Sequence, residues 1–370
     1  MKYYIIAGEA SGDLHGSNLM KALYEEDPNA EIRFWGGDLM QDVGGTLVKH
    51  YRELAFMGFI EVIFNLKTIL SNIKICKNDI AQFKPDVIIY IDYPGFNMRI
   101  AKWAKEKGYK NHYYISPQIW AWKENRITAI KHDIDKMYVI LPFEKDFYEV
   151  KHQFPVEFVG HPLIDAIYNQ SSLVANTFRT ENHLSEKPII AILPGSRKQE
   201  ISKMLTVMLS VVKDFSDYQF VIAGAPSQEL SFYQQFISGE NIKFVSNKTY
   251  SLLRNSTAAL VTSGTATLET ALFKVPEVVC YKGSWASYQI AKRIITLKYI
   301  SLVNLIMDRE VVTELIQDDC SSKRIREELT KILEPNYRKT LLENYDLLEE
   351  KLGGIGASKK TAHLIVQAIK

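Results

Sequence analysis

Acidic side chains beside glycine turns are the first residues in this sequence that could do chemistry. Asp92 follows the apolar run Val87–Ile91. Partial withdrawal from water raises the pKa of such a carboxylate, which suits it to act as a general base toward a hydroxyl group. Glu9 and Asp13, in the segment Gly8–Gly16, are the reserve candidates. Each acid also has an ordinary alternative, as a helix cap or as the start of a turn.

Two loops in the second half of the chain could hold a diphosphate. Pro194-Gly195-Ser196-Arg197 places a glycine, a hydroxyl and a guanidinium directly after a buried run. Helix amides there favour an anion, and arginine adds paired donors. Ser263-Gly264-Thr265 follows a second such run, and Glu269 lies one helical turn further, where it can accept hydrogen bonds from a ribose diol. Either loop alone would be an ordinary strand-to-helix connection, but two favour a nucleotide site.

Several cofactor and metal signatures are absent from the sequence. Gly8, Gly12 and Gly16 are spaced by four, which is not the dinucleotide pattern, and no phosphate-loop pattern occurs. The 3 cysteines and 8 histidines show neither a CxxC nor an HExxH spacing. We therefore expect no metal and no cofactor, and we expect Arg197 and helix dipoles to neutralise a leaving diphosphate.

Composition excludes some classes of partner. The 370 residues include 45 Lys and Arg against 43 Asp and Glu, a net charge of +2, so the chain as a whole does not favour nucleic acid. No run of about 18 apolar residues is present, and the N-terminus does not resemble a signal peptide. These features predict a cytoplasmic protein without a membrane-spanning helix, and the length allows two domains.

Short apolar runs alternate with helical patterns, which is typical of parallel sheets with crossover helices. We expect strands at Tyr3–Ala7, Ile32–Trp35, Val87–Ile91, Asn111–Ile115, Met137–Leu141, Val156–Val159, Ile189–Leu193, Phe220–Ala223, Ile242–Val245, Ala259–Thr262 and Val278–Tyr281. The fold class is thus α/β, with two Rossmann-like, doubly wound parallel sheets that face a cleft. Ligands of such folds bind at the carboxyl ends of the strands, where the acids and both loops would lie.

Composition also suggests the domain boundaries. We expect an N-terminal domain over 1–168, a polar linker over 169–187 and a second domain over 188–335. The helical tail, 336–370, is expected to pack back on an N-terminal domain.

An amphipathic segment over Phe56–Leu70 could contact lipid. Its apolar side chains and nearby lysines suit a bilayer interface or acyl chains, although burial against the first sheet is the usual role of such a helix and dimerisation is a third alternative. The candidate lipid-contacting residues are Phe59, Ile60, Val62, Ile63, Phe64 and Leu66.

Nine motifs in order along essentially the whole chain resemble the lipid-A-disaccharide synthase family. They are Ala7-Gly8-Glu9-Ala10-Ser11-Gly12-Asp13, Met57-Gly58-Phe59-Ile60-Glu61-Val62, Ile91-Asp92-Tyr93-Pro94-Gly95-Phe96-Asn97, Ser116-Pro117-Gln118-Ile119-Trp120-Ala121-Trp122, Leu141-Pro142-Phe143-Glu144, Gly160-His161-Pro162, Leu193-Pro194-Gly195-Ser196-Arg197, Ser263-Gly264-Thr265-Ala266-Thr267-Leu268-Glu269 and Leu302-Val303-Asn304-Leu305.

The resemblance implies a GT-B glycosyltransferase of lipid A biosynthesis. Such an enzyme would join UDP-2,3-diacylglucosamine to 2,3-diacylglucosamine 1-phosphate, form a β-1,6 disaccharide and release UDP, as a peripheral protein on the cytoplasmic face of the inner membrane of Gram-negative bacteria. Carried over to this sequence, it makes Asp92 the base, Arg197 the diphosphate contact, Glu269 the ribose contact and Asn304 a residue near the sugar nucleotide. Gly95 replaces a second acid that the family often has, which weakens a two-carboxylate mechanism.

Other interpretations remain open at this point. Another UDP-sugar enzyme of the same architecture, such as a UDP-N-acetylglucosamine 2-epimerase or the lipid II glycosyltransferase, is the nearest alternative. A non-catalytic module that binds sugar nucleotides or lipids is a different class.

Overall fold

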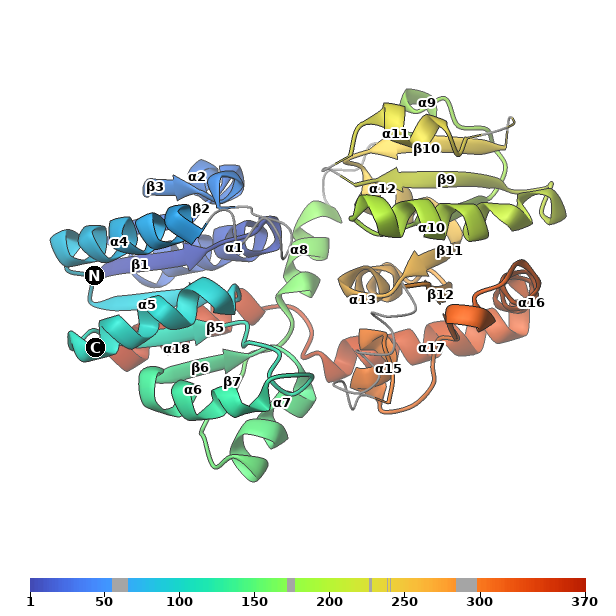
Figure 1. Ribbon diagram of the computed structural model, residues 1–370. Helices are drawn as coiled ribbons and strands as arrows, with labels where there is room; N and C mark the ends of the chain where they lie inside the picture. The colour runs from blue at the N-terminus through green and yellow to red at the C-terminus, as the bar shows by residue number, and fades with distance from the viewer. Residues whose placement is uncertain (55–65, 172–176, 226–227, 238, 240, 284–297) are drawn as a thin grey trace. The chain divides into compact units, whose positions relative to one another are not determined.

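The computed structural model describes residues 1–54, 66–171, 177–225, 228–237, 239, 241–283 and 298–370 (Figure 1). These residues form two compact units. Unit 1 comprises Met1–Ala166 together with Leu352–Lys370, and unit 2 comprises Ile167–Lys351. Each unit has its own parallel sheet with helices packed on it, which confirms the expected α/β fold class.

The sheet of unit 1 is built from runs of apolar and aromatic residues. Its strands are β1 (Lys2–Ala7), β2 (Glu31–Gly36), β3 (Thr46–His50), β4 (Val87–Ile91), β5 (Asn111–Tyr114), β6 (Lys136–Val139) and β7 (Glu157–Phe158). They lie in the order β3-β2-β1-β4-β5-β6-β7, and each neighbouring pair is parallel. All of β4 and nearly all of β1 are buried, as expected for parallel strands covered on both faces.

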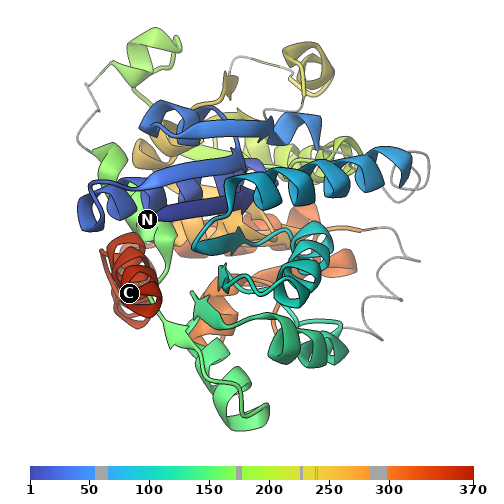
Figure 2. The same ribbon diagram turned by 90° about the vertical axis from the view of Figure 1, so that its left-hand side faces the viewer.

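The helices of unit 1 include one from the far end of the chain. They are α1 (Ala10–Glu26), α2 (Asp38–Val43), α4 (Leu66–Phe83), α5 (Pro94–Glu106), α6 (Ile127–Asp133), α7 (Pro142–Asp146) and α18 (Ala357–Ile369), with α8 (Pro162–Ser171) passing into unit 2. α18 packs against α1 and lies with the elements of unit 1 in both views (Figures 1 and 2). The Asp165 carboxylate accepts the N–H groups of Gly356 and Ser358, at 2.7 and 2.9 Å, and so caps α18.

Unit 2 repeats the same construction. Its strands are β8 (Ile189–Leu193), β9 (Gln219–Gly224), β10 (Ile242–Ser246), β11 (Ser256–Thr262), β12 (Glu277–Tyr281) and β13 (Glu314–Ile316), in the order β10-β9-β8-β11-β12-β13, all parallel. Its helices are α9 (Phe178–Glu181), α10 (Lys198–Met208), α11 (Leu230–Gln234), α12 (Thr249–Arg254), α13 (Thr265–Leu272), α15 (Leu302–Met307), α16 (Ser322–Leu333) and α17 (Pro335–Lys351).

The eleven expected strands are all present, with ends that differ by at most three residues. Sequence analysis missed β3 and β13. β3 is an edge strand with no fully buried residue, and β13 is only three residues long. Neither has the run of buried apolar side chains that identifies a central parallel strand.

The unit boundaries differ from those expected from composition. The residues expected to form a linker, 169–187, belong to unit 2 where they are described, and of the two C-terminal helices only α18 belongs to unit 1. α17 packs on α13, α15 and α16 instead. Its buried side chains, Leu341, Tyr345 and Leu348, supply the reason, because an amphipathic helix stays with the elements that cover its apolar face.

The amphipathic segment is described only from residue 66 onward. In α4, Ile73, Cys76 and Ile80 join the core of unit 1, whereas Leu70 is 56% exposed. Phe59, Ile60, Val62, Ile63 and Phe64 lie outside the described residues, as does the side chain of Leu66. Within the described part of the chain, no helix has both the length and the apolar composition to cross a bilayer.

Candidate active site

Asp92 lies directly after β4, at the carboxyl edge of the sheet of unit 1. Its backbone and that of Tyr93 are left-handed, with φ of +44° and +47°. Such conformations cost roughly 1–3 kcal/mol each for residues with a β-carbon and persist only where the surroundings enforce them. The Asp92 carbonyl accepts the Tyr113 hydroxyl at 2.6 Å and the Asn97 side-chain amide at 2.7 Å. These two bonds hold the strained turn that presents the Asp92 side chain.

The Asp92 carboxylate has the electrostatic character of a base. Burial, and to a smaller extent the negative charge of Glu9, raise its pKa from 3.8 to about 6. Glu9 is exposed at the residue that precedes α1. A carboxylate with a pKa near 6 is ionised at neutral pH yet binds a proton more strongly than an ordinary aspartate.

Gly8 lies beside the Asp92 turn because β1 and β4 are neighbours in the sheet. A β-carbon added at Gly8 would lie 2.3 Å from the Tyr93 ring. The glycine therefore leaves the space that Tyr93 occupies. The structure thus brings Gly8, Glu9 and Asp92 together at one edge.

Asp13 has a structural role, because its carboxylate caps the start of α2. Its carboxylate is buried and accepts the N–H groups of Gly37, Leu39 and Met40 at 2.7, 3.1 and 3.0 Å. It therefore satisfies the free amides at the start of α2, which the preceding Gly37 cannot cap. With these three bonds, Asp13 fits the role of anchor between α1 and α2 better than that of a base.

Glu144 is a buried acid that sequence analysis did not select for the site. Its carboxylate accepts the Ser116 hydroxyl at 2.5 Å, the Trp120 indole N–H at 3.1 Å and the backbone N–H groups of Ile140 and Leu141 at 3.1 and 2.9 Å. It thus ties the loop after β5 to the loop after β6. The available signal was an acid two residues after Pro142, and in the structure it lies in the first turn of α7, at a capping position.

Unit 2 presents its first loop after β8. Gly195 has φ of +99°, and a β-carbon there would lie 2.3 Å from Glu200 Oε2. The Ser196 N–H donates to the same oxygen at 3.4 Å. Arg197 is exposed at the N-cap of α10. A carboxylate already accepts the Ser196 N–H, so an anion suits this turn.

The second loop follows β11 and leads into α13. Ser263 donates to the Ile300 carbonyl at 3.0 Å, and Gly264, with φ of +138°, precedes Thr265 at the first helical position. Glu269 lies one turn further, where burial raises its pKa to about 7. β8 and β11 are neighbours in the sheet, so the structure brings both loops to the same edge of unit 2.

Asn304, expected near the sugar nucleotide, lies inside unit 2 in α15, which packs against α13. Its side chain is fully buried, donates to the Val312 carbonyl and Glu314 Oε1 at 2.8 and 2.9 Å, and accepts the N–H groups of Val311 and Val312. Both the nitrogen and the oxygen of its side-chain amide are therefore engaged inside unit 2, and they hold the segment before β13.

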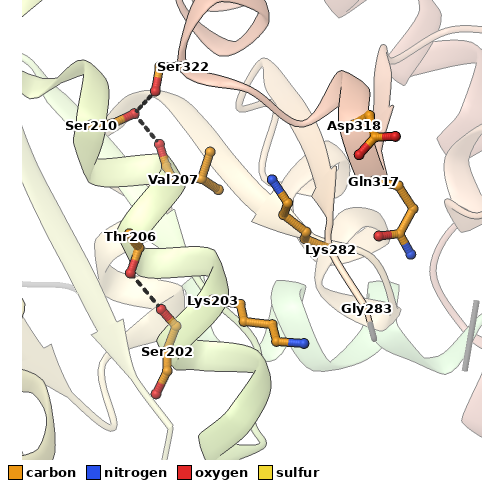
Figure 3. Close-up of a pocket in the computed structure, with 10 residues that line it drawn as sticks. All are labelled: Ser202, Lys203, Thr206, Val207, Ser210, Lys282, Gly283, Gln317, Asp318 and Ser322. Carbon is orange, nitrogen blue, oxygen red and sulfur yellow. Dashed lines mark hydrogen bonds between the residues drawn. The ribbon is translucent and has the colours of Figure 1, made fainter. Parts of the chain in front are cut away.

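A hollow of about 830 Å³ lies on unit 2 between α10, the end of β12 and the start of α16 (Figure 3). Lys203 and Lys282 line it together with Asp318. The hydroxyls of Ser202 and Thr206 donate to carbonyls of α10 itself. Since none of the candidate site residues is among those that line it, we do not assign the chemistry to this hollow.

The comparisons with known proteins agree with one another. The family model described as lipid-A-disaccharide synthetase matches residues 3–366. The chain is 38% identical to the lipid-A-disaccharide synthase of Syntrophus aciditrophicus (strain SB), over 99% of this chain and 97% of that protein. It is 38% identical to that of Idiomarina loihiensis (98% and 97% covered) and 37% identical to that of Coxiella burnetii (98% and 96% covered).

Solved structures share the fold at much lower identity. The UDP-GlcNAc 2-epimerase from Neisseria meningitidis bound to UDP-GlcNAc has a TM-score of 0.67 at 14% identity, with 100% of this chain and 99% of that chain covered. The glycotransferase of kitacinnamycin has a TM-score of 0.65 at 12% identity, with 99% and 98% covered. These similarities support the GT-B fold.

Proposed function

The chain belongs to the lipid-A-disaccharide synthetase family, and on that premise we propose that it transfers 2,3-diacylglucosamine from its UDP derivative to 2,3-diacylglucosamine 1-phosphate. The products are the β-1,6 disaccharide 1-phosphate and UDP. The observation that carries this proposal is the family match over residues 3–366. The half-buried Asp92 adds a base of suitable pKa.

The proposed chemistry is a single inverting displacement. Asp92 accepts the proton of the acceptor 6-hydroxyl as that oxygen attacks the anomeric carbon of the donor. The bond between this carbon and the UDP oxygen breaks, and the configuration inverts. Arg197 and the amides at the starts of α10 and α13 neutralise the diphosphate that leaves. The diphosphate would replace Glu200 as the acceptor at the Ser196 N–H.

One assay tests the function directly. The protein is incubated with both diacylated monosaccharides, and the expected products are disaccharide and UDP in equal amounts. Conversion of UDP-N-acetylglucosamine to its 2-epimer in place of disaccharide would instead favour the epimerase alternative. UDP binding with no product from either substrate would favour a binding module. The family match and the curated relatives favour the transferase.

Arg197→Ala is expected to weaken UDP binding by about 10- to 100-fold, since hydrogen bonds to charged groups contribute roughly 1.5–3 kcal/mol each. Titration calorimetry with UDP measures this. Arg326→Ala is a matched control, because Arg326 is a partly exposed arginine of α16 that pairs with Asp214. Unchanged UDP affinity in the Arg197 variant would remove this residue from the site.

For location, we propose peripheral binding to the cytoplasmic face of the inner membrane through the amphipathic segment. In the described part of that region, α4 exposes the apolar side chains of Leu70 and Ile75, and lysines alongside would favour anionic lipid.

A joint Phe59/Ile60/Val62/Phe64→Ser variant should lose flotation with vesicles of phosphatidylethanolamine and phosphatidylglycerol. Val150→Ser, which changes another exposed apolar residue of unit 1, should float like the wild type. Equal flotation of all three proteins would refute a role for the segment.

A further inference from the structure

The carboxylate of Glu269 has a neighbour from a different helix. The Tyr250 hydroxyl, on α12, donates to Glu269 Oε1 on α13 at 3.2 Å. Among the described residues, this is the one hydrogen bond that the carboxylate accepts. Since each carboxylate oxygen can accept about two hydrogen bonds, the remaining positions, including those on Oε2, are available to a ligand.

The Tyr250 hydroxyl is held in place by the packing of its ring. The ring lies at a tilt of 59° to that of Phe273, with centroids 5.0 Å apart. Phe273 directly follows α13, and the Arg254 guanidinium lies over its ring at 5.4 Å. Aromatic pairs of this geometry are favourable beyond their buried area. The stack therefore fixes the donor relative to the helix that carries Glu269.

The hydrogen bond also matters for the charge of Glu269. Burial raises the pKa of this carboxyl group to about 7, and the bond from Tyr250 opposes that rise because it stabilises the ionised form. Burial also raises the pKa of Tyr250 above its usual value of 10, so the hydroxyl keeps its proton. Loss of the bond would leave less of the carboxylate ionised near neutral pH.

We propose that Tyr250 is a positioning residue that gives the donor site its preference for ribose over 2′-deoxyribose. Its hydroxyl holds the Glu269 carboxylate in one orientation and in its ionised form, in which it accepts hydrogen bonds from the ribose diol. This proposal rests on the proposed function, because it takes Glu269 as the ribose contact of a UDP-sugar site.

The chemistry of the two sugars explains the expected preference. The ribose diol offers two O–H donors, and an ionised carboxylate is purely an acceptor. A 2′-deoxyribose offers one donor fewer, so a buried acceptor would lose a partner on binding. A protonated carboxyl group has itself become a donor and recognises the diol less well.

The experiment is calorimetric titration of UDP and of 2′-deoxyuridine diphosphate into the full-length protein. The wild type should bind UDP about 10-fold or more tightly than the deoxy analogue. Tyr250→Phe should weaken UDP binding by about 10-fold and change binding of the deoxy analogue by less than a factor of about 2. Glu269→Gln should abolish the preference, and adding Tyr250→Phe to it should have no further effect.

Tyr345→Phe is the matched control, because it removes a hydroxyl in the same unit that has no partner among the described residues. It should leave both affinities unchanged. Melting curves show whether Tyr250→Phe folds. If it does not, Phe273→Leu, which removes the ring against which Tyr250 packs, should reduce the same preference.

Three outcomes would overturn the proposal. The first is an equal loss of affinity for UDP and for the deoxy analogue in Tyr250→Phe. The second is an unchanged UDP affinity in that variant, and the third is a wild type that binds both nucleotides with equal affinity. Because binding is measured without turnover, a protein that makes no disaccharide but prefers UDP through Tyr250 would refute the proposed function and support this inference. A protein that makes the disaccharide but shows no preference for UDP that depends on Tyr250 would support the proposed function and refute this inference.

Discussion

Asp92→Asn is expected to lower turnover by a factor on the order of 10²–10⁴, while UDP affinity stays unchanged. An asparagine amide has nearly the shape of the carboxylate but cannot accept the proton of the acceptor hydroxyl. The turn should survive the change, because the bonds from Tyr113 and Asn97 go to the Asp92 backbone carbonyl and not to its side chain. Initial rates with both diacylated substrates, together with UDP calorimetry, measure the two effects.

Asp86→Asn is the matched control for this variant. Asp86 precedes β4 at the amino edge of the same sheet, where its carboxylate accepts the Lys2 N–H at 2.8 Å. The two aspartates thus flank one strand at opposite ends, and only the one at the carboxyl edge should affect turnover. Near-normal turnover of Asp92→Asn would exclude Asp92 as the base.

Asp92 also predicts how kcat/KM depends on pH. Since the base must be ionised and its pKa is about 6, kcat/KM should fall as the pH drops below about 6. Glu9→Gln removes a negative charge that raises the pKa of Asp92. In that variant the fall in kcat/KM should therefore move to lower pH, and in Asp92→Asn it should disappear.

Glu144→Ala is expected to lower the free energy of unfolding by at least about 3 kcal/mol, because it leaves three buried donors unpaired at a cost of roughly 1–3 kcal/mol each. The lost acceptor serves two side chains, those of Ser116 and Trp120, and two backbone amides. Urea unfolding followed by tryptophan fluorescence measures the change, with Trp120 reporting from the site itself. The loop after β5 should lose its structure before the rest of unit 1 unfolds.

Two further variants separate hydrogen bonding from packing at this position. Glu144→Gln keeps the volume but turns one acceptor into a donor that faces other donors, so it should also destabilise unit 1. Glu157→Ala, at an exposed glutamate of β7, should change the unfolding free energy by less than about 0.5 kcal/mol. Equal stability of Glu144→Gln and wild type would show that the four bonds contribute little.

Much of each sheet could be predicted from sequence because its signal is local. Runs such as Val87–Ile91 and Ile189–Leu193 are apolar throughout, and the strand ends there agree with the structure. β13 is too short to show such a run, and its place beside β12 depends on contacts between segments far apart in sequence. The division of the two C-terminal helices between the units also depends on contacts between distant segments, since α17 packs on helices of unit 2 and α18 packs on α1 of unit 1.

The sequence by itself determined the family, the alternation of strands and helices, and the set of loops that follow strand ends. These properties reside in motifs and in local runs of side chains. Tertiary structure alone decided what each acid in those loops does. Asp13 accepts hydrogen bonds from backbone amides at the start of α2, and Asp92 is half-buried beside Glu9. Glu269 accepts a hydrogen bond from Tyr250, nineteen residues away in the sequence. Proton affinity depends on burial and on neighbouring charges and donors, and the fold brings those neighbours together from distant parts of the chain.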